Sequence, residues 1–253
     1  MIAFDPLIYL LAIPAVLLVG ISKSGLSGGM GMIAVPLLAV SISPVQAAAI
    51  MLPILCAIDL FVIYNYRHQW DRWNLWTLVP GALIGIGIGA LTFSYVDENS
   101  LRILLGTIAL IFSLNGFRTA KATEGVAPKR WIGRLCGLTA GYTSFVAHAG
   151  GAPVKFFLLP QKMDKTLFVG TNAVFFLIVN YTKLVPYAWL GQLDFTNLTT
   201  SLILSPLVPL GVWLGLVLHK RISQELFYQV SYVLLFVAGA KLIWDGFSRS
   251  GWV

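Results

Sequence analysis

The chain alternates long apolar runs with short polar segments. The runs predict helical segments at residues 7–21, 32–41, 45–66, 75–95, 101–117, 131–147, 152–160, 167–188, 196–218 and 224–247. A helix needs about 20 predominantly apolar residues to cross the hydrocarbon core of a bilayer. The pattern therefore predicts an all-α polytopic membrane protein.

Two glycine-rich breaks interrupt this pattern, one in each half of the chain. They occupy residues 20–31 and 141–151, and each contains a Gly-Gly pair (Gly28 and Gly29, Gly150 and Gly151) between two apolar runs. Interrupted apolar segments at corresponding places in two halves indicate the substrate site of a secondary transporter. Non-helical backbone is tolerated at membrane depth where it is buried in protein or lines a wet cavity. We therefore expect the two breaks to meet at the substrate site.

Internal similarity and loop charge predict two inverted repeats. Pro80, Gly85 and Gly89 recur as Pro206, Gly211 and Gly215 at a constant offset. Placing every basic connection in the cytoplasm satisfies the positive-inside rule if each broken pair is a hairpin. The basic connections are residues 67–72, 118–134, 162–165 and 219–221, and the base-poor ones are 41–44, 96–100 and 189–196.

The expected organisation is a first transmembrane repeat at residues 1–118, a cytoplasmic linker at 119–130 and a second repeat at 131–253. Each repeat consists of a glycine-broken helical hairpin plus three spanning helices, which gives eight spans if each hairpin counts as one crossing. In the alternative, each broken pair is one kinked crossing and the repeats are parallel.

Composition narrows the class of protein. Hydrophobic residues make up 58% of the chain, charged residues 11%, and the mean hydropathy is +0.83, so no soluble domain is expected. The net charge of +7 comes from the loops, which predicts the lipid bilayer and not nucleic acid as the partner. Cys56 and Cys136 lie inside apolar runs without metal or disulfide spacing. No catalytic arrangement is present, so we expect no enzyme, no metal and no cofactor.

The candidate substrate-binding residues are the glycines and polar groups of the two breaks, together with Asn172. They are Ser22, Lys23, Ser24, Gly25, Gly28, Gly29, Thr143, Ser144, His148, Gly150, Gly151, Lys155 and Asn172. A helix that starts after a break offers free N–H groups and a positive dipole end to an anion. A cation is costly within a membrane, and its presence in each break indicates anion attraction.

Other interpretations of these residues remain open. The glycines would equally permit close helix packing, and the Lys23 stem would reach an interface by snorkelling. Hydroxyl groups in helices often bond only to their own backbone. His148 fits three roles: a donor to the anion, a proton carrier or a hydrogen-bonded core residue.

Three further polar residues are candidates for coupling or gating. Asp59 lies in the run 45–66, and Asn180 and Lys183 lie in the corresponding run 167–188. Ionisable groups within a membrane are functional candidates by default. Asp59 and Lys183 would form a pair, or Asp59 would carry a proton. Alternatively, both would face the headgroups, because each lies near the end of its run.

Several motifs resemble those of the sulfite exporter TauE/SafE family, also called the toluene-sulfonate uptake permease family. They are residues 20–32, 143–153, 158–166 and 169–176, followed by Asn180 and residues 183–187. The resemblance implies a bacterial inner-membrane protein that moves sulfur-containing anions such as sulfite, sulfoacetate or related sulfonates. Both export and uptake are attributed to the family. Lys155 stands where the resemblance leads us to expect a small or apolar residue.

The function we expect is a secondary transporter that exports a small sulfur-containing anion across the bacterial inner membrane. The alternatives are an uncoupled anion channel and an uptake permease for another small organic anion. A homodimer is left open as the assembly.

Overall fold

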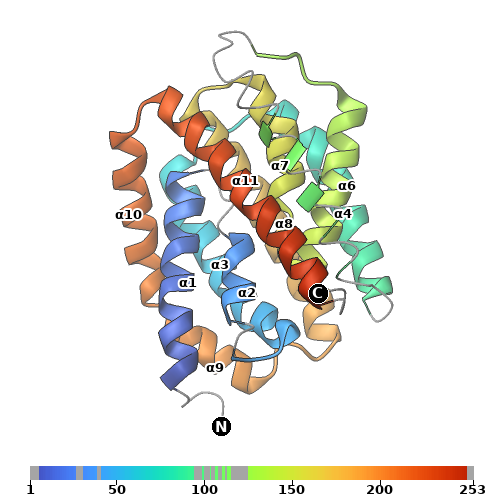
Figure 1. Ribbon diagram of the computed structural model, residues 1–253, viewed down its shortest axis with the longest axis vertical. Coiled ribbons are helices and arrows are strands. Elements are labelled where there is room, and N and C mark those ends of the chain that lie inside the picture. Colours follow the sequence, from blue (N-terminus) through green and yellow to red (C-terminus); the bar gives the residue numbers. More distant parts are fainter. Residues whose placement is uncertain are drawn as a thin grey trace. The chain divides into compact units, whose positions relative to one another are not determined.

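The structure is a computed structural model that describes residues 6–26, 31–38, 41–93, 99, 103, 106–107, 110–111, 113–114 and 125–249. Within these residues every regular element is helical (Figure 1). The elements are α1 (Pro6–Gly25), α2 (Gly31–Leu38), α3 (Pro44–Tyr66), α4 (Arg72–Thr92), α6 (Arg130–Ala147), α7 (Gly151–Leu158), the 3-10 turn η2 (Leu159–Gln161), α8 (Lys165–Trp189), α9 (Phe195–Leu204), α10 (Leu207–Arg221) and α11 (Gln224–Arg249).

Four helices are long and apolar enough to span a membrane within the described part of the chain. The candidate spans are Ile8–Gly25, Val45–Tyr66, Arg72–Thr92 and Lys165–Trp189. The predicted all-helical character is confirmed for the described residues, and these four helices are candidate spans by length and composition. The predicted segment 101–117 lies mostly outside the described residues. The inverted arrangement of eight spans stays a prediction.

The segment expected as one run at 196–218 is instead two helices. α9 and α10 meet at an angle of 47° around Ser205 and Pro206. Proline has no N–H to donate, and its ring disfavours a continuous helix. The Ser205 hydroxyl donates to the Leu202 carbonyl over 2.7 Å, which satisfies one acceptor at the end of α9. Pro80, the match of Pro206 in the first half, lies inside α4 and does not end it.

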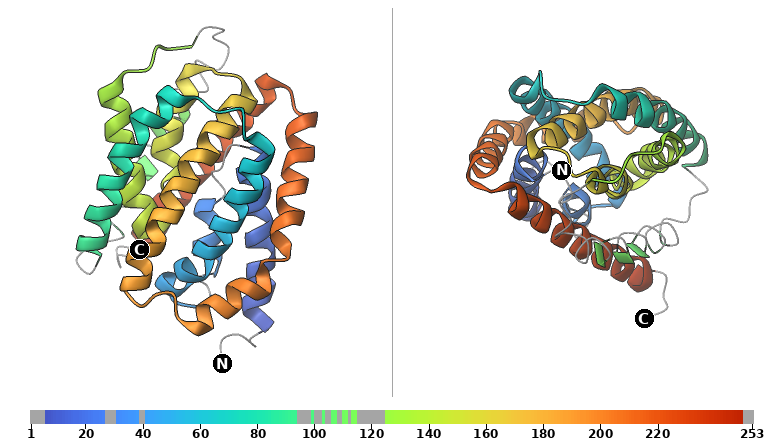
Figure 2. Two further views of the ribbon diagram at one scale, coloured as in Figure 1. Left: turned by 180° about the vertical axis from the view of Figure 1, so that it is seen from behind. Right: turned by 90° about the horizontal axis from the view of Figure 1, so that it is seen from above.

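The chain forms two compact units, and each takes segments from both halves of the sequence. The first unit contains Met1–Leu75 and Thr166–Ile222. Its α1 and α10 lie side by side (Figures 1 and 2). A Cβ atom on Gly20 would lie 2.9 Å from Gly211, and one on Gly25 would lie 2.5 Å from the Gly215 carbonyl. Paired glycines therefore let these two backbones touch.

The second unit contains Trp76–Lys165 and Ser223–Val253. Here α4 and α6 lie side by side (Figure 1), again through glycines. Gly81 and Gly85 of α4 face the α6 backbone, while Gly137 and Gly141 of α6 face the α4 backbone. A Cβ atom at any of these four positions would overlap a backbone carbonyl oxygen. The four-residue glycine spacing in both helices thus produces a close backbone contact.

Candidate functional site

One face of α8, in the first unit, carries three buried polar residues. Asn172, Phe176, Asn180 and Lys183 follow one another at intervals of four, four and three residues, which places them on one side of a helix. Asn172, Asn180 and Lys183 are each at most 1% exposed. This face of α8 is therefore a buried polar stripe within an otherwise apolar helix.

An ion pair joins α1 to α3 beside this stripe. The Lys23 ammonium contacts the Asp59 carboxylate, and the Asn180 amide donates to Asp59 Oδ2 over 2.6 Å. The Lys23 ammonium also lies 5.4 Å from the centre of the Phe176 ring. Asp59 is fully buried and Lys23 is only 7% exposed. Three helices of the first unit thus hold one carboxylate between a cation and an amide.

This geometry separates the interpretations that the sequence left open. Lys23 is buried beside a carboxylate, so its ammonium does not snorkel to an interface. Asp59 and Lys183 are both buried and do not face the headgroups. Asp59 forms an ion pair with Lys23, and the expected pairing of Asp59 with Lys183 stays a prediction. Because the formal charges of Lys23 and Asp59 cancel, Lys23 is less suited to bind an anion alone than the sequence suggested.

Sequence reasoning missed a second cluster, at the C-terminal end of α1. The Tyr66 hydroxyl donates to the Ser24 carbonyl over 2.7 Å, and His219 Nδ1 lies 3.2 Å from the Gly25 carbonyl. A carbonyl only accepts, so Nδ1 carries the proton of this bond. His219 Nε2 lies 3.3 Å from the Thr166 hydroxyl. The sequence signal that could have revealed this cluster is that His219 follows Gly215 by four residues, which places His219 on the same face of α10 as the glycines.

Two candidate hydroxyls bond to backbone. Ser24 Oγ lies 2.7 Å from the Gly20 carbonyl and 3.0 Å from the Val212 carbonyl of α10. Thr143 Oγ1 donates to the Thr139 carbonyl over 2.8 Å. Ser22 and Ser144 are buried. Ser24 and Thr143 therefore make helix contacts that do not depend on a ligand.

The second break has a defined turn. α6 ends at Ala147, and the next residue, the C-cap His148, has left-handed φ and ψ angles of 50° and 27°. Its N–H bonds to the Ser144 carbonyl over 3.2 Å, and the next N–H, of Ala149, bonds to the Thr143 carbonyl over 3.1 Å. Glycine is the usual residue in this conformation, and a side chain there is unfavourable. The break thus holds a strained histidine with only 8% exposure.

The two glycines of the second break differ in their surroundings. A Cβ atom on Gly150 would lie 2.6 Å from the Ala140 carbonyl oxygen and 2.8 Å from Ser144 Cβ. Among the described residues, a Cβ built on Gly151 meets no atom within 4 Å apart from its chain neighbours and the backbone of its own helix. Gly150 is therefore required by packing, whereas packing does not explain Gly151. The open space lies at the first residue of α7, whose N-cap, Gly150, supplies no side-chain hydrogen bond.

Lys155 follows Gly151 by one helical turn. It is 1% exposed, and its ammonium makes no hydrogen bond in the described part of the chain. Helical side chains lean toward the N-terminus, so residue i+4 lies over residue i. The Lys155 stem is therefore directed along the face of α7 that carries Gly151. A buried ammonium, an uncapped helix start and open space occur together in the second unit.

Gly28 and Gly29 lie outside the described residues, with Ser27 and Met30, whereas residues 20–25 of the first break form the last turns of α1 and are not a break in the helix. The two breaks belong to different units. The meeting of the breaks at one site therefore stays a prediction.

Long apolar helices with buried charged residues define a multi-pass membrane protein with polar groups in its interior. The family profile described as "Sulfite exporter TauE/SafE" matches residues 12–242, nearly the whole chain. The chain belongs to this family, and it is accordingly a membrane transporter of the sulfite-exporter type. This membership agrees with the expectation that the chain is not an enzyme. Comparisons with curated proteins and with solved structures found no match.

Proposed function

We propose that the chain exports a small sulfur-containing anion, such as sulfite, sulfoacetate or a related organosulfonate, across the bacterial inner membrane. The proposed mechanism is secondary transport. The anion binds at the start of α7, where Lys155 neutralises its charge and the N–H groups of Gly151 and Ala152 donate to its oxygens. Thr143, Ser144 and His148 of the same break are further candidate contacts of the anion, and the roles of Asn172 and of the first break stay predictions from the sequence.

The observation that carries this proposal is the buried Lys155 ammonium without a hydrogen-bond partner among the described residues. An ionised group out of water is costly unless it is paired. A chain that keeps such a group one helical turn after the open space at the start of α7 gains stability if an anion enters. The α7 dipole favours the same sign of ligand charge. Oxygens of sulfite and sulfonates are acceptors, and the Lys155 ammonium and the N–H groups of Gly151 and Ala152 are donors.

The ion pair of the first unit is suited to coupling. Asp59 accepts from Asn180 and pairs with Lys23, so protonation of Asp59 would leave Lys23 without its counter-charge. Removing one charge of a buried pair is strongly unfavourable and favours a rearrangement of its surroundings. We propose that Asp59 carries the coupling proton, with Asn180 and Lys183 controlling its access and orientation.

Transport by purified protein in proteoliposomes tests this function. Sulfite, sulfoacetate, taurine, thiosulfate, sulfate and oxalate are offered in turn, with and without an imposed pH gradient. We expect accumulation of a sulfur-containing anion against its own gradient when the pH gradient is present. Flux that only follows the anion gradient would contradict secondary transport and favour a channel. Transport of oxalate alone would contradict the substrate class.

A further inference from the structure

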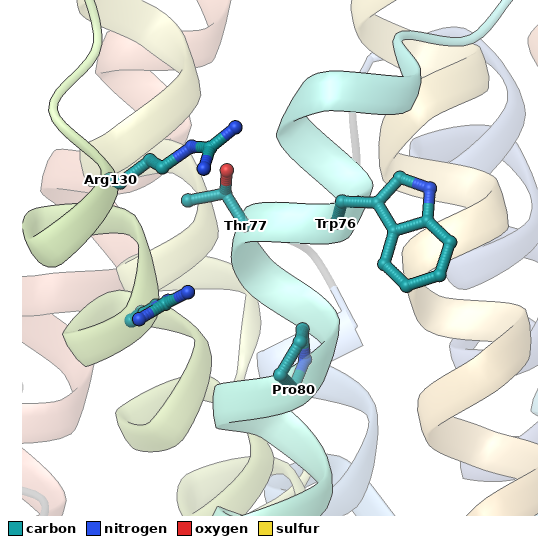
Figure 3. A pocket seen from close by; sticks show the side chains of 5 residues that line it. Trp76, Thr77, Pro80 and Arg130 are labelled. Carbon is teal, nitrogen blue, oxygen red and sulfur yellow. The ribbon is translucent and has the colours of Figure 1, made fainter.

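A pocket in the second unit carries two arginines that the transport mechanism does not use. It has a volume of about 330 Å³ and is lined by Trp76, Thr77 and Pro80 of α4 and by Arg130 and Arg134 of α6. In Figure 3 the Arg130 side chain extends from α6 toward Thr77, while the ring of Trp76 points away on the other side of α4. The pocket is therefore cationic between the helices and aromatic at its outer edge.

The close packing of α4 and α6 fixes the position of the two arginines. Arg130 and Arg134 are one helical turn apart, so they share a face of α6. Gly81 packs against the backbone of Arg134, and Gly133 packs against the Thr77 side chain. Both arginine side chains are exposed, whereas Thr77 is buried. Two planar guanidinium groups thus stand beside a hydroxyl, and guanidinium forks match the geometry of phosphate oxygens.

An apolar stripe leads away from this pocket along α4. Ile84, Ile88 and Leu91 follow Pro80 at intervals of four, four and three residues, and their side chains are 58%, 41% and 75% exposed. On a span of a membrane protein such a stripe contacts acyl chains. The exposed indole of Trp76 lies at the other end, and tryptophan prefers the headgroup level. The two arginines and the indole therefore lie near the same end of α4, and the apolar stripe runs from there toward the other end, as headgroup region and hydrocarbon follow one another in a membrane.

We infer that this pocket binds an anionic phospholipid, with its phosphate between Arg130 and Arg134 and one acyl chain along the exposed face of α4. Basic pockets between spanning helices on the cytoplasmic side are suited to anionic headgroups. The loop charges predict that this end of α4 and α6 faces the cytoplasm. The apolar stripe favours a lipid over a free phosphate or sulfonate, because a soluble anion gains nothing from it. The inference does not depend on the transported substrate.

Native mass spectrometry of the purified protein tests this inference. The protein is incubated with equimolar phosphatidylglycerol and phosphatidylcholine, and the ratio of the two adducts is measured. We expect wild type to prefer phosphatidylglycerol. In R130A/R134A the ratio of phosphatidylglycerol to phosphatidylcholine adducts should be roughly tenfold to thirtyfold lower than in wild type. The ratio is internal to each folded species, so a partly unfolded variant does not imitate the effect.

The matched control is K220A/R221A. It removes the same charge from exposed residues at the end of α10, and we expect the wild-type lipid ratio. An unchanged ratio in R130A/R134A, or an equal loss in the control, would overturn the assignment. A separate arm adds sn-glycerol 3-phosphate at the same phosphate concentration. If sn-glycerol 3-phosphate displaces bound phosphatidylglycerol as effectively as added lipid does, the assignment is also overturned, because the pocket would then bind a soluble anion.

Discussion

Asp59→Asn isolates the ion pair at the centre of the first unit. The variant keeps an oxygen that accepts from Asn180, but it leaves the Lys23 ammonium buried without its counter-charge. Removing one partner of a buried pair is expected to lower the free energy of unfolding by about 3–5 kcal/mol. For a chain of this size that corresponds to a decrease in Tm of about 6–20 °C.

A double-mutant cycle separates the pair from its surroundings. Lys23→Met together with Asp59→Asn removes both charges, and we expect this protein to recover more than half of the loss seen in either single variant. Thermal unfolding of the four purified proteins in one detergent measures the coupling.

The Lys241 and Asp245 pair of α11 provides a matched control. It is an i,i+4 pair whose lysine side chain is 45% exposed and whose aspartate side chain is 8% exposed. Because water solvates the Lys241 ammonium, Asp245→Asn leaves no buried unpaired charge. The loss should be that of an i,i+4 pair, about 0.3–0.5 kcal/mol, which corresponds to at most about 2 °C in Tm. If the Tm losses of Lys23→Met and Asp59→Asn add up in the double variant, the two charges are not coupled. If Asp245→Asn lowers Tm as much as Asp59→Asn does, burial of the pair does not decide the effect.

The remaining predictions concern the glycines and the topology. Gly150→Ala should lower Tm because its Cβ atom meets the Ala140 carbonyl oxygen, whereas Gly151→Ala should leave Tm nearly unchanged; the reverse order would contradict the packing argument. Gly25→Ala should destabilise the contact of α1 with α10 by about 1–3 kcal/mol, while Gly87→Ala, which meets no atom within 4 Å, should be neutral or slightly stabilising. Single cysteines at Asn99 and Gln192 should label from outside intact cells and one at Gln69 should not; labelling of Gln69 alone would reverse the orientation, and external labelling at Ser223 would contradict inverted repeats.

The apolar pattern was sufficient to predict most helices, because span length and polar loops follow directly from the bilayer. It failed at Pro206, since the pattern alone does not show whether a proline bends a helix or ends it. Pro80 and Pro206 correspond in sequence, yet only the second separates two helices.

For the candidate site, the sequence predicted which residues are unusual but not which of them contact one another. The sequence marks Lys23, Asp59 and Asn180 as unusual because charged and amide groups are costly in apolar runs. It does not reveal that Asp59 contacts Lys23, because that contact depends on how α1 packs against α3. The His219 contact was missed for the same reason: a histidine in a basic segment reads as a loop residue until the glycines of α10 bring its helix against α1.

Anion binding to purified Lys155→Met protein measures whether Lys155 binds the transported anion. Without an anion the variant should have a higher Tm than wild type, because a buried charge without a hydrogen-bond partner in the described structure is removed. With sulfite or sulfoacetate its affinity should fall about tenfold to a hundredfold, the loss expected for a charge-assisted hydrogen bond. Lys241→Met should keep wild-type affinity. Wild-type affinity in Lys155→Met would contradict the account.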